Sequence, residues 1–421
     1  MNIVLFLLFL SGTVQYRFIG GQVSFALLEP IVLFVASLLL LRILFRNEGI
    51  QVPRDRILLL LSMLMLWVCI IRPWAEDWKG GLSDLRDWAI PAIGFLILLC
   101  LVRRGWRKWT GVFLVAVVIQ AILGIYQHAT DSSRPFIDIA MVSKMGYGQQ
   151  EGDVLSPLVS FAVGLFAHPN GYAMYLLAGL MIAIGLVGSR KRRVLSTCVS
   201  VPVAIALYWS YGRSAVGIAV VAVFWFAWYQ HSVTRRMTTV LLIGAVAGAF
   251  LFGWGNLVAT ISATLGNLYW RVGLWKTAVD VINSNPAILL LGNGMEEFGR
   301  QAYYGQPHNV YVYFLLQYGA VGLALLLGVV ANLWRRGMRA LKDGLARREP
   351  LLVGVWLALL GFFGVGLGES NLMGIENRQN LLMIVVLFIG LEREVREEGE
   401  REYSVGEVAA RERIETVPVA I

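Results

Sequence analysis

Long apolar runs recur from one end of the chain to the other and are separated by polar stretches. Many of them are close to the length of about 20 residues that an α-helix needs to cross a bilayer. The pattern predicts an all-α polytopic membrane protein with about 12 transmembrane helices. The expected spans are residues 2–19, 23–45, 57–72, 88–102, 110–127, 164–188, 194–210, 214–230, 237–254, 308–333, 351–368 and 379–392.

The composition supports this fold class. The 421 residues are 57% hydrophobic and 15% charged, and the mean hydropathy is +0.67, whereas a soluble domain carries about 25% charged residues. The net charge of +9 comes from basic residues in short loops beside apolar runs, which is typical of membrane topology. We therefore expect membrane lipids, and no nucleic acid, as partners. The first run lacks a basic start and a cleavage site, so we expect it to be a membrane helix.

Alternate loops differ in their content of Lys and Arg. One set carries 20 such residues, and the other set, which has longer loops, carries 11. Because cytoplasmic loops are enriched in basic residues, both termini are predicted to be cytoplasmic. The membrane domain is then residues 1–392, with large periplasmic loops at 73–87, 128–163 and 255–307. The mixed-charge tail, residues 393–421, is predicted to be cytoplasmic and disordered.

The segment 255–307 is the longest polar excursion between apolar runs. Leucine and isoleucine recur at helical spacing in its first half, at Leu257, Ile261, Leu265 and Leu268. This spacing, followed by Trp270 and Trp275, predicts a helix on the membrane surface. Asn285-Pro286 is expected to end the helical pattern, and Gly292-Asn293-Gly294 is expected to form a turn.

A histidine, His308, lies between Pro307 and Asn309 at the predicted outer start of an apolar helix. One interpretation is a helix cap or a histidine packed at the membrane interface. The other is a general base, or a hydrogen-bond donor to a phosphate. Arginines at the ends of helices and in the same loop, all on the same predicted side, favour the second interpretation.

Arg213 lies in a minimal turn, Ser210-Tyr-Gly-Arg213-Ser214, between two apolar runs. In a protein whose inner loops are basic, an outer arginine in a tight turn has no topological role. It either reaches toward lipid headgroups or provides a fixed cation for an anionic lipid ligand. The same two interpretations apply to Arg271, and with less support to Arg300 and Arg378. An ion pair with Glu376 or Glu369 explains Arg378 equally well.

Pro169 and Gly171 interrupt another apolar run directly after His168. Irregular backbone at membrane depth is tolerated only against protein or a water-filled cavity. His168 and Asn170 are therefore predicted to face a cavity. The sequence contains no Walker motif, no Ser-His-Asp pattern and no cluster of metal-ligating residues, so we predict neither a cofactor nor a metal.

Four segments, in this order, resemble the O-antigen ligase and polymerase superfamily (the WaaL/Wzy type). They are Phe166-Ala-His168-Pro169-Asn170-Gly-Tyr-Ala-Met-Tyr-Leu, Ser210-Tyr-Gly-Arg213-Ser214, Arg271-Val-Gly-Leu-Trp275 with the Asn285-Pro286 and Leu291-Gly292-Asn293-Gly294 segments, and Pro307-His308-Asn309 with Tyr318-Gly319-Ala-Val-Gly322. The resemblance covers residues 160–330. It has one departure, because Trp275 stands where the family often has leucine.

The resemblance implies a glycosyltransferase in the bacterial inner membrane, with its active site on the periplasmic side. The donor would be a glycan linked to undecaprenyl diphosphate, and the acceptor would be lipid A-core or another glycan. Arg213 and Arg271 would hold the diphosphate, and His308 would assist attack by the acceptor hydroxyl. Accessory positions are His168, Asn170, Asn309, Arg300 and Arg378. Transfer would invert the anomeric centre without a metal, which is reasonable because arginines in a low-dielectric cleft stabilise a phosphate leaving group.

Several functions remain open at this point. We favour an O-antigen ligase of lipopolysaccharide biosynthesis. The alternative is a polymerase for O-antigen, capsule or exopolysaccharide, and a third option is a protein O-glycosylating relative. A lipid or glycan transporter is less favoured, because it would need charges near the bilayer midplane or paired broken helices in two halves.

Overall fold

The computed structural model describes residues 17–20, 23–26, 30–38, 54–74, 78–102, 104–130, 164, 166, 169–187, 192–210, 212–230, 269–302, 306–369, 372 and 375–415. Nearly all of this part of the chain is helical. Its one sheet is a short hairpin of β1 (Arg17–Gly20) and β2 (Val23–Ala26), paired antiparallel with Arg17 opposite Ala26.

The helices follow one another along the chain with short connections in the described part. They are residues 30–38, α3 (Arg56–Ile71), the 3-10 turn η1 (Arg72–Trp74), α4 (Trp78–Leu101), α5 (Trp106–Ala129), α6 (Pro169–Val187), α7 (Arg193–Trp209), α8 (Arg213–Gln230), residues 269–284, α10 (Ala287–Leu291), α11 (Met295–Gln301), α12 (Val310–Lys342), α13 (Leu345–Arg348), α14 (Pro350–Val365) and α15 (Ile375–Glu415).

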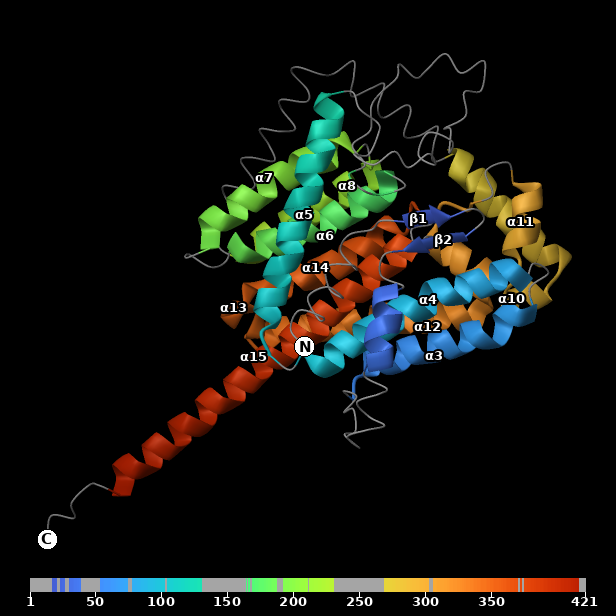
Figure 1. Cartoon of the computed structure of the whole chain (residues 1–421). Helices are drawn as coiled ribbons and strands as arrows, with labels where there is room; N and C mark the ends of the chain where they lie inside the picture. The colour runs from blue at the N-terminus through green and yellow to red at the C-terminus, as the bar shows by residue number, and fades with distance from the viewer. Residues whose placement is uncertain are drawn as a thin grey trace, which may run out of the picture.

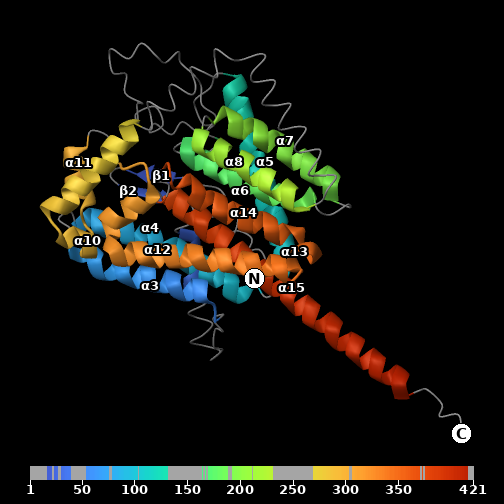
Figure 2. The ribbon, with the colours of Figure 1, turned by 180° about the vertical axis from the view of Figure 1, so that it is seen from behind.

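Two helices form the centre of the bundle. α14 is apolar on every side and is buried on nearly every side, and the apolar part of α15, residues 379–392, is buried in the same way. Such all-round hydrophobicity is typical of a helix enclosed by others. α3, α4 and α12 pack on one side of this centre, and α5 to α8 pack on the other (Figures 1 and 2).

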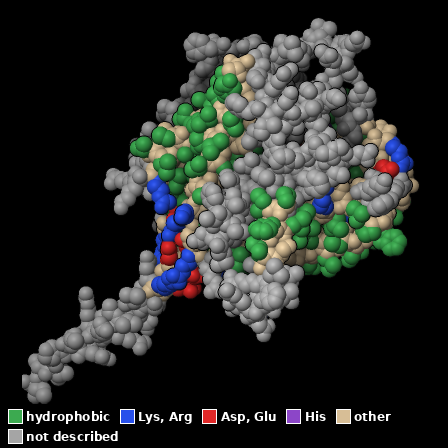
Figure 3. Space-filling model, in the orientation of Figure 1, with side chains coloured by type: hydrophobic (Ala, Val, Ile, Leu, Met, Phe, Trp, Pro, Cys, Tyr) green, Lys and Arg blue, Asp and Glu red, His purple; other side chains and the backbone are tan. Residues whose placement is uncertain are grey.

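The helices that surround this centre are apolar on their outer faces as well. Leu59 and Leu66 of α3 and Val115 of α5 are each about 60% exposed, and Figure 3 shows hydrophobic side chains over these flanks. Among the described residues, three helices are long and apolar enough to cross a membrane, namely Arg56–Trp74, Trp106–Ala129 and Val310–Lys342. The helical fold is thus confirmed and includes candidate membrane spans, while the count of 12 spans stays a prediction.

The apolar runs predicted the helices of the middle and later chain closely. α3, α5, α6, α7, α8 and α14 each begin or end within a few residues of the expected spans. The expected loop 128–163, the run 237–254 and the first half of the loop 255–307 lie outside the described residues. In the second half of that loop, the break at Asn285-Pro286 and the turn at Gly292-Asn293-Gly294 are confirmed.

The start of the chain differs from the prediction. The hairpin β1–β2 occupies the end of the expected span 2–19 and the beginning of the expected span 23–45. Backbone pairing between the two strands, from Arg17 opposite Ala26 to Gly20 opposite Val23, replaces the helix expected at these positions. In the following segment, helix is described over residues 30–38.

The expected outer loop 73–87 is mostly helical. α4 begins at Trp78, about ten residues before the predicted span, and carries Asp84, Arg86 and Asp87 in its early turns. Polar residues predict a loop here, but charged side chains are compatible with a buried helix when they are paired. Asp84 is paired in this way, as described below.

The tail also differs from the prediction. α15 continues through Glu415, well beyond the end of the membrane domain expected at residue 392, and it projects away from the bundle (Figures 1 and 2). Charges of opposite sign one turn apart stabilise a helix. Such pairs join Glu397 to both Arg393 and Arg401, and Glu392 to Arg396. The mixed charge that predicted disorder is therefore arranged along one helix.

One end of the bundle is held by ion pairs between helix termini. Arg336, near the end of α12, binds Asp55 before α3 at 2.6 Å and Glu392 of α15 at 2.8 Å. Arg107 of α5 binds Glu398 of α15 at 2.6 Å. Figure 3 shows these charge types gathered where α15 leaves the bundle. This is the end that the basic loops predicted to be cytoplasmic.

The other end of the bundle contains a kink in α12. Gly319 has φ 68° inside the helix, and Gly292 (φ 81°) lies against it. The kink exposes carbonyl groups of α12, which accept hydrogen bonds from Asn293 N (to Gln317 O, 3.1 Å) and Gly294 N (to Leu316 O, 2.8 Å). The segment between the helix 269–284 and α12 is thereby fastened to α12.

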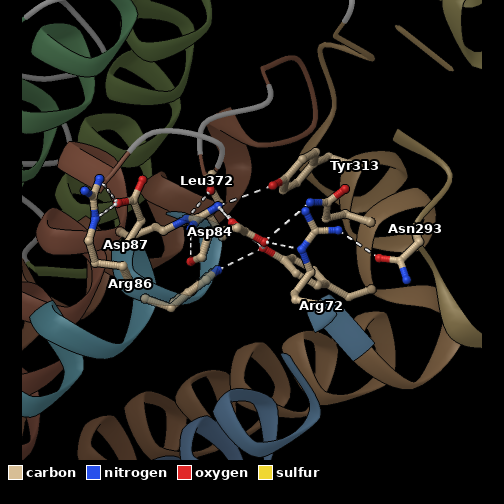
Figure 4. A network of polar contacts seen from close by, with 11 residues as sticks. Arg72, Asp84, Arg86, Asp87, Asn293, Tyr313 and Leu372 are labelled. Carbon is tan, nitrogen blue, oxygen red and sulfur yellow. Dashed lines mark hydrogen bonds and ion pairs between the residues drawn. The ribbon is translucent and has the colours of Figure 1, made fainter. Parts of the chain in front are cut away.

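A buried network of polar side chains supports this kink (Figure 4). Asp84 of α4 pairs with Arg378 of α15 at 2.5 Å and with Arg72 of η1 at 3.2 Å. The hydroxyl of Tyr318 donates to Asp84 at 2.8 Å. Arg72 donates to the Asn293 side chain at 2.8 Å, so the network joins η1, α4, α12, α15 and the glycine turn.

Arg378 was predicted to pair with Glu376 or Glu369, and the structure instead pairs it with Asp84. The Arg378 side chain is only 1% exposed and also donates from Nε to Leu372 O at 2.7 Å. Its guanidinium lies 4.8 Å from the centre of the Trp88 ring, a cation–π arrangement. Arg378 is therefore a buried part of the scaffold, and it anchors the connector between α14 and α15.

The carboxyl group of Asp84 has a lowered pKa. Burial alone would raise this pKa, but the charges of Arg378 and Arg72 and the hydrogen bonds from Tyr318 and Arg378 outweigh burial and hold it below the usual value of 3.8. The ionised Asp84 carboxylate therefore contributes its full stabilisation above about pH 4. That stabilisation is lost as the pH falls through the lowered pKa.

Gly319→Ala is expected to destabilise the protein. A Cβ on Gly319 would lie 2.1 Å from Leu290 O at a positive φ, and a left-handed backbone alone costs about 1–2 kcal/mol for a residue other than glycine. The apparent melting temperature in detergent should fall, and protease should cut residues 285–302 faster. Gly328→Ala is the control, because its Cβ would lie 3.4 Å from the Leu60 side chain, an ordinary contact. Equal stability of the two variants would contradict this account of the kink.

Asp84→Asn is expected to destabilise the protein more strongly, because it leaves a buried arginine without its anion, at a cost of about 3–5 kcal/mol. Asp87→Asn on the same helix removes a partly exposed pair with Arg86 and should cost about 1 kcal/mol or less. Melting temperatures measured against pH should show the Asp84 contribution unchanged from about pH 5 to pH 8 and lost only in strong acid. A contribution that disappears near neutral pH would contradict the pairing.

Candidate functional site

A carboxylate, Glu369, lies at the centre of the candidate site. It belongs to the connector between α14 and α15 and binds three polar side chains. Oε1 accepts from Arg271 Nη2 at 2.9 Å, and Oε2 lies 3.0 Å from Asn170 Nδ2 and 3.3 Å from His308 Nδ1. We refer to Asn170, Arg271, His308 and Glu369 as the Glu369 cluster. Three residues predicted from sequence are thus brought together.

The Glu369 cluster is partly buried. The side chain of Glu369 is 13% exposed, and those of Arg271 and His308 are 22% and 24% exposed. Hydrogen bonds between charged groups are stronger in such surroundings than in water, yet each side chain remains reachable from outside. The site is therefore sheltered without being closed.

Helix starts converge on this cluster. Asn170 is in the first turn of α6, and His308 lies directly before Asn309, the N-cap of α12. Arg271 reaches the cluster from the helix 269–284. α8 also begins nearby, since a Cβ on Gly368 would lie 3.1 Å from Ser214 Oγ and 2.8 Å from Arg271 Nη1. Helix N-termini carry unpaired N–H groups and partial positive charge, so their convergence favours an anion.

His308 has a strained backbone, with φ 46°. The left-handed region is unfavourable for residues other than glycine, by about 1–2 kcal/mol. Asn309, which follows, is the N-cap of α12, and its Oδ1 accepts from Tyr311 N at 2.9 Å. Asn309 Nδ2 donates to Leu367 O at 3.0 Å. Asn309, and not His308, therefore caps α12. The imidazole of His308 contacts Glu369 instead.

The imidazole of His308 is oriented for proton transfer. With the ring proton on Nδ1, that nitrogen donates to Glu369, and Nε2 carries a free lone pair. Among the described residues, no hydrogen bond to Nε2 is found. The Trp270 ring covers one side, with its centre 5.2 Å from that of the imidazole. A histidine held by a carboxylate in this way is suited to act as a general base.

Arg271 retains a free donor. Its Nη2 binds Glu369, whereas its Nε is buried and has no hydrogen-bond partner within the described part of the chain. A buried donor without a partner costs about 1–3 kcal/mol, which a ligand oxygen would recover. Since guanidinium groups bind phosphate through paired N–H donors, Arg271 is suited to an anionic ligand.

Arg213 lies beside the Glu369 cluster and not within it. It is the first residue of α8 and is exposed, and no ion pair to it is found among the described residues. Its neighbour Ser214 is the residue that approaches Gly368 next to Glu369. Arg213 is therefore an exposed cation beside the Glu369 cluster.

The remaining predicted positions have other surroundings. His168 lies outside the described residues. Arg300 is about half exposed and binds Glu297 at 2.9 Å and Glu296 at 3.2 Å within its own short helix, α11. Arg378 belongs to the buried Asp84 network described above. Within the described residues, no group of three or more His, Cys, Asp or Glu side chains is arranged to hold a metal ion.

The sequence predicts for Glu369 only an ion pair with Arg378, and it does not predict a role at the site. The available signal was its position, because a carboxylate directly after an apolar run is costly unless it is paired. The sequence could not identify that partner, since Asn170, Arg271 and His308 lie 199, 98 and 61 residues away along the chain. Only the approach of α6, the helix 269–284 and the start of α12 to the α14–α15 connector brings them together.

Comparison with known proteins agrees with the sequence motifs. The family model for O-antigen ligase matches residues 198–327, from α7 into α12, a region that contains Arg213, Arg271 and His308. No curated protein matches the chain. Asn170 and Glu369 lie outside the matched region and are joined to it by the contacts described above. The match supports the resemblance of residues 198–327 to the O-antigen ligase and polymerase superfamily.

Proposed function

We propose that this protein transfers a glycan from undecaprenyl diphosphate to an acceptor hydroxyl at the Glu369 cluster. The observation that carries the proposal is the shared carboxylate. Glu369 contacts both Arg271 and His308 within one partly buried site. Arg271 can bind a phosphate group, and His308 can accept a proton from a hydroxyl group. Both residues lie in the region matched by the O-antigen ligase family.

The donor diphosphate would bind on the arginine side of the cluster. The free Nε of Arg271, the exposed guanidinium of Arg213 and the converging helix starts all favour negative charge there. As the bond to the sugar breaks, negative charge develops on the diphosphate oxygen. Fixed cations in a sheltered site stabilise that charge without the need for a metal.

The acceptor would bind on the histidine side. Its hydroxyl oxygen forms the new bond to the anomeric carbon, while the bond from that carbon to the diphosphate oxygen breaks. The hydroxyl proton passes to Nε2 of His308, and Glu369 stabilises the resulting imidazolium through Nδ1. Attack from the face opposite the diphosphate inverts the anomeric centre, and the released products are the elongated acceptor and undecaprenyl diphosphate.

The site would face the periplasm, with both termini in the cytoplasm of a bacterial inner-membrane protein. The Glu369 cluster and the ion-paired end of the bundle are at opposite ends of α12, which has His308 before its start and Arg336 near its end. Basic loops at the ion-paired end favour the cytoplasm for that end. We favour a ligase that transfers O-antigen to lipid A-core, and the alternative is a polymerase for O-antigen, capsule or exopolysaccharide.

Two substitutions test the site without disturbing the scaffold. Asparagine tolerates positive φ, so His308→Asn should keep the turn and lose the base, with transfer reduced at least about 100-fold. Arg213→Gln replaces an exposed cation and should reduce transfer similarly while the melting temperature is unchanged. Arg300→Gln is the matched control, because Arg300 is another exposed arginine in the matched region, bound to its own helix. Each variant is measured by complementation of a strain that lacks the gene.

Protein levels in the membrane are measured in parallel, so that loss of transfer is separated from loss of protein. A His308→Asn or Arg213→Gln variant that is inserted normally and transfers glycan at the wild-type rate would contradict the proposed roles. Equal loss of transfer in the Arg300→Gln control would point to general sensitivity of the matched region.

The choice between ligase and polymerase is tested by deletion of the gene. A ligase predicts that complete lipid-linked polymer accumulates without being joined to its acceptor. A polymerase predicts surface products that carry a single repeat unit. Gel analysis of the surface glycan and of extracted lipid-linked glycan distinguishes the two outcomes, and an unchanged glycan profile would contradict both.

A further inference from the structure

The side chains of Arg271 and Trp275 lie one helical turn apart on the helix 269–284, so they share one face of it. Arg271 reaches Glu369, and Trp275 Nε1 donates to Pro307 O at 3.0 Å. Pro307 directly precedes His308, whose Nδ1 lies 3.3 Å from Glu369. These contacts form a closed ring that passes through the helix, Glu369, the His308 turn and Trp275.

The His308 turn needs support on both sides because its backbone is strained. On the α12 side, Asn309 Nδ2 donates to Leu367 O and Val310 N donates to Gly366 O. On the other side, the indole of Trp275 holds the carbonyl of Pro307. A non-glycine residue with positive φ persists only where its surroundings determine it, and the Trp275 bond is part of those surroundings.

The indole ring has two separable functions. Its apolar body packs against a small cluster that includes Leu274, Ala278 and Phe298, and its N–H makes the bond to Pro307. Phenylalanine retains most of the apolar body and cannot donate. Leucine also lacks a donor.

We propose that Trp275 is a positioning residue, which fixes the His308 turn to the helix that carries Arg271. The proposal rests on the proposed function of these two residues. Its consequence is that the diphosphate-binding cation and the base are held at a constant separation, as transfer between two bound substrates requires. A leucine at this position would leave the turn attached to the connector alone.

Trp275→Phe is expected to lower the transfer rate about tenfold, because a modest displacement of a catalytic group has a large effect on rate. The Kd for undecaprenyl diphosphate, measured by calorimetry in detergent, should stay within about twofold, because Arg213 and Arg271 are retained. Trp67→Phe is the matched control. Its indole also donates to a main-chain carbonyl, Tyr318 O at 2.7 Å, and it is also partly buried, but the partner Tyr318 is ten residues beyond His308 along the chain. Transfer by Trp67→Phe should equal that of the wild type.

A second measurement does not depend on activity. The chain has four histidines, so ¹⁵N-labelled imidazoles give few signals, and the His308 signal is identified by its absence in His308→Asn. Trp275→Phe should shift this signal, and Trp67→Phe should leave it in place. A His308 signal that is unmoved in Trp275→Phe overturns the positioning proposal. Normal transfer by His308→Asn contradicts the proposed function and leaves the positioning result standing, so the two failures are distinguishable.

Discussion

The buried ion pair between Asp84 and Arg378 is the interaction on which the rest of this end of the molecule depends. Two charges removed from water are costly unless each finds several partners, and here Arg72, Tyr318 and the Leu372 carbonyl supply them. Through these partners the pair joins α4, η1, α12 and α15. It also anchors the connector that carries Glu369, since Leu372 lies three residues beyond it.

The Glu369 cluster sits on this scaffold as a second, more exposed polar centre. The two centres differ in what they leave free. In the Asp84 network each ionised group has an ion-pair partner. In the described part of the chain, no protein partner is found for Nε of Arg271, Nε2 of His308 or the guanidinium of Arg213. Unmatched donors and acceptors at a sheltered surface are what a substrate requires, and matched ones deeper inside keep them in place.

The strained turn at His308 shows how the two sides of the site are linked. It is held by the α14–α15 connector on one side and by the indole of Trp275 on the other. The helix with Arg271 and the start of α12 therefore move together. In a protein whose outer surfaces are apolar, these few polar contacts determine geometry that apolar packing leaves undefined, because apolar contacts have no directional preference.

The sequence by itself determined the helical membrane architecture, most helix boundaries from α3 to α14, and the candidates Asn170, Arg271 and His308, because apolar length and local motifs are properties of neighbouring residues. The predictions were wrong for the first hairpin, for the start of α4 and for the charged end of α15. There, strand pairing or ion pairs between particular residues decide the structure, and the average polarity of the segment does not. Only the tertiary structure decided which charges meet. Asp84 and Arg378 are 294 residues apart, and Glu369 gathers side chains from three distant segments, so their pairing follows from helix packing and not from any local pattern.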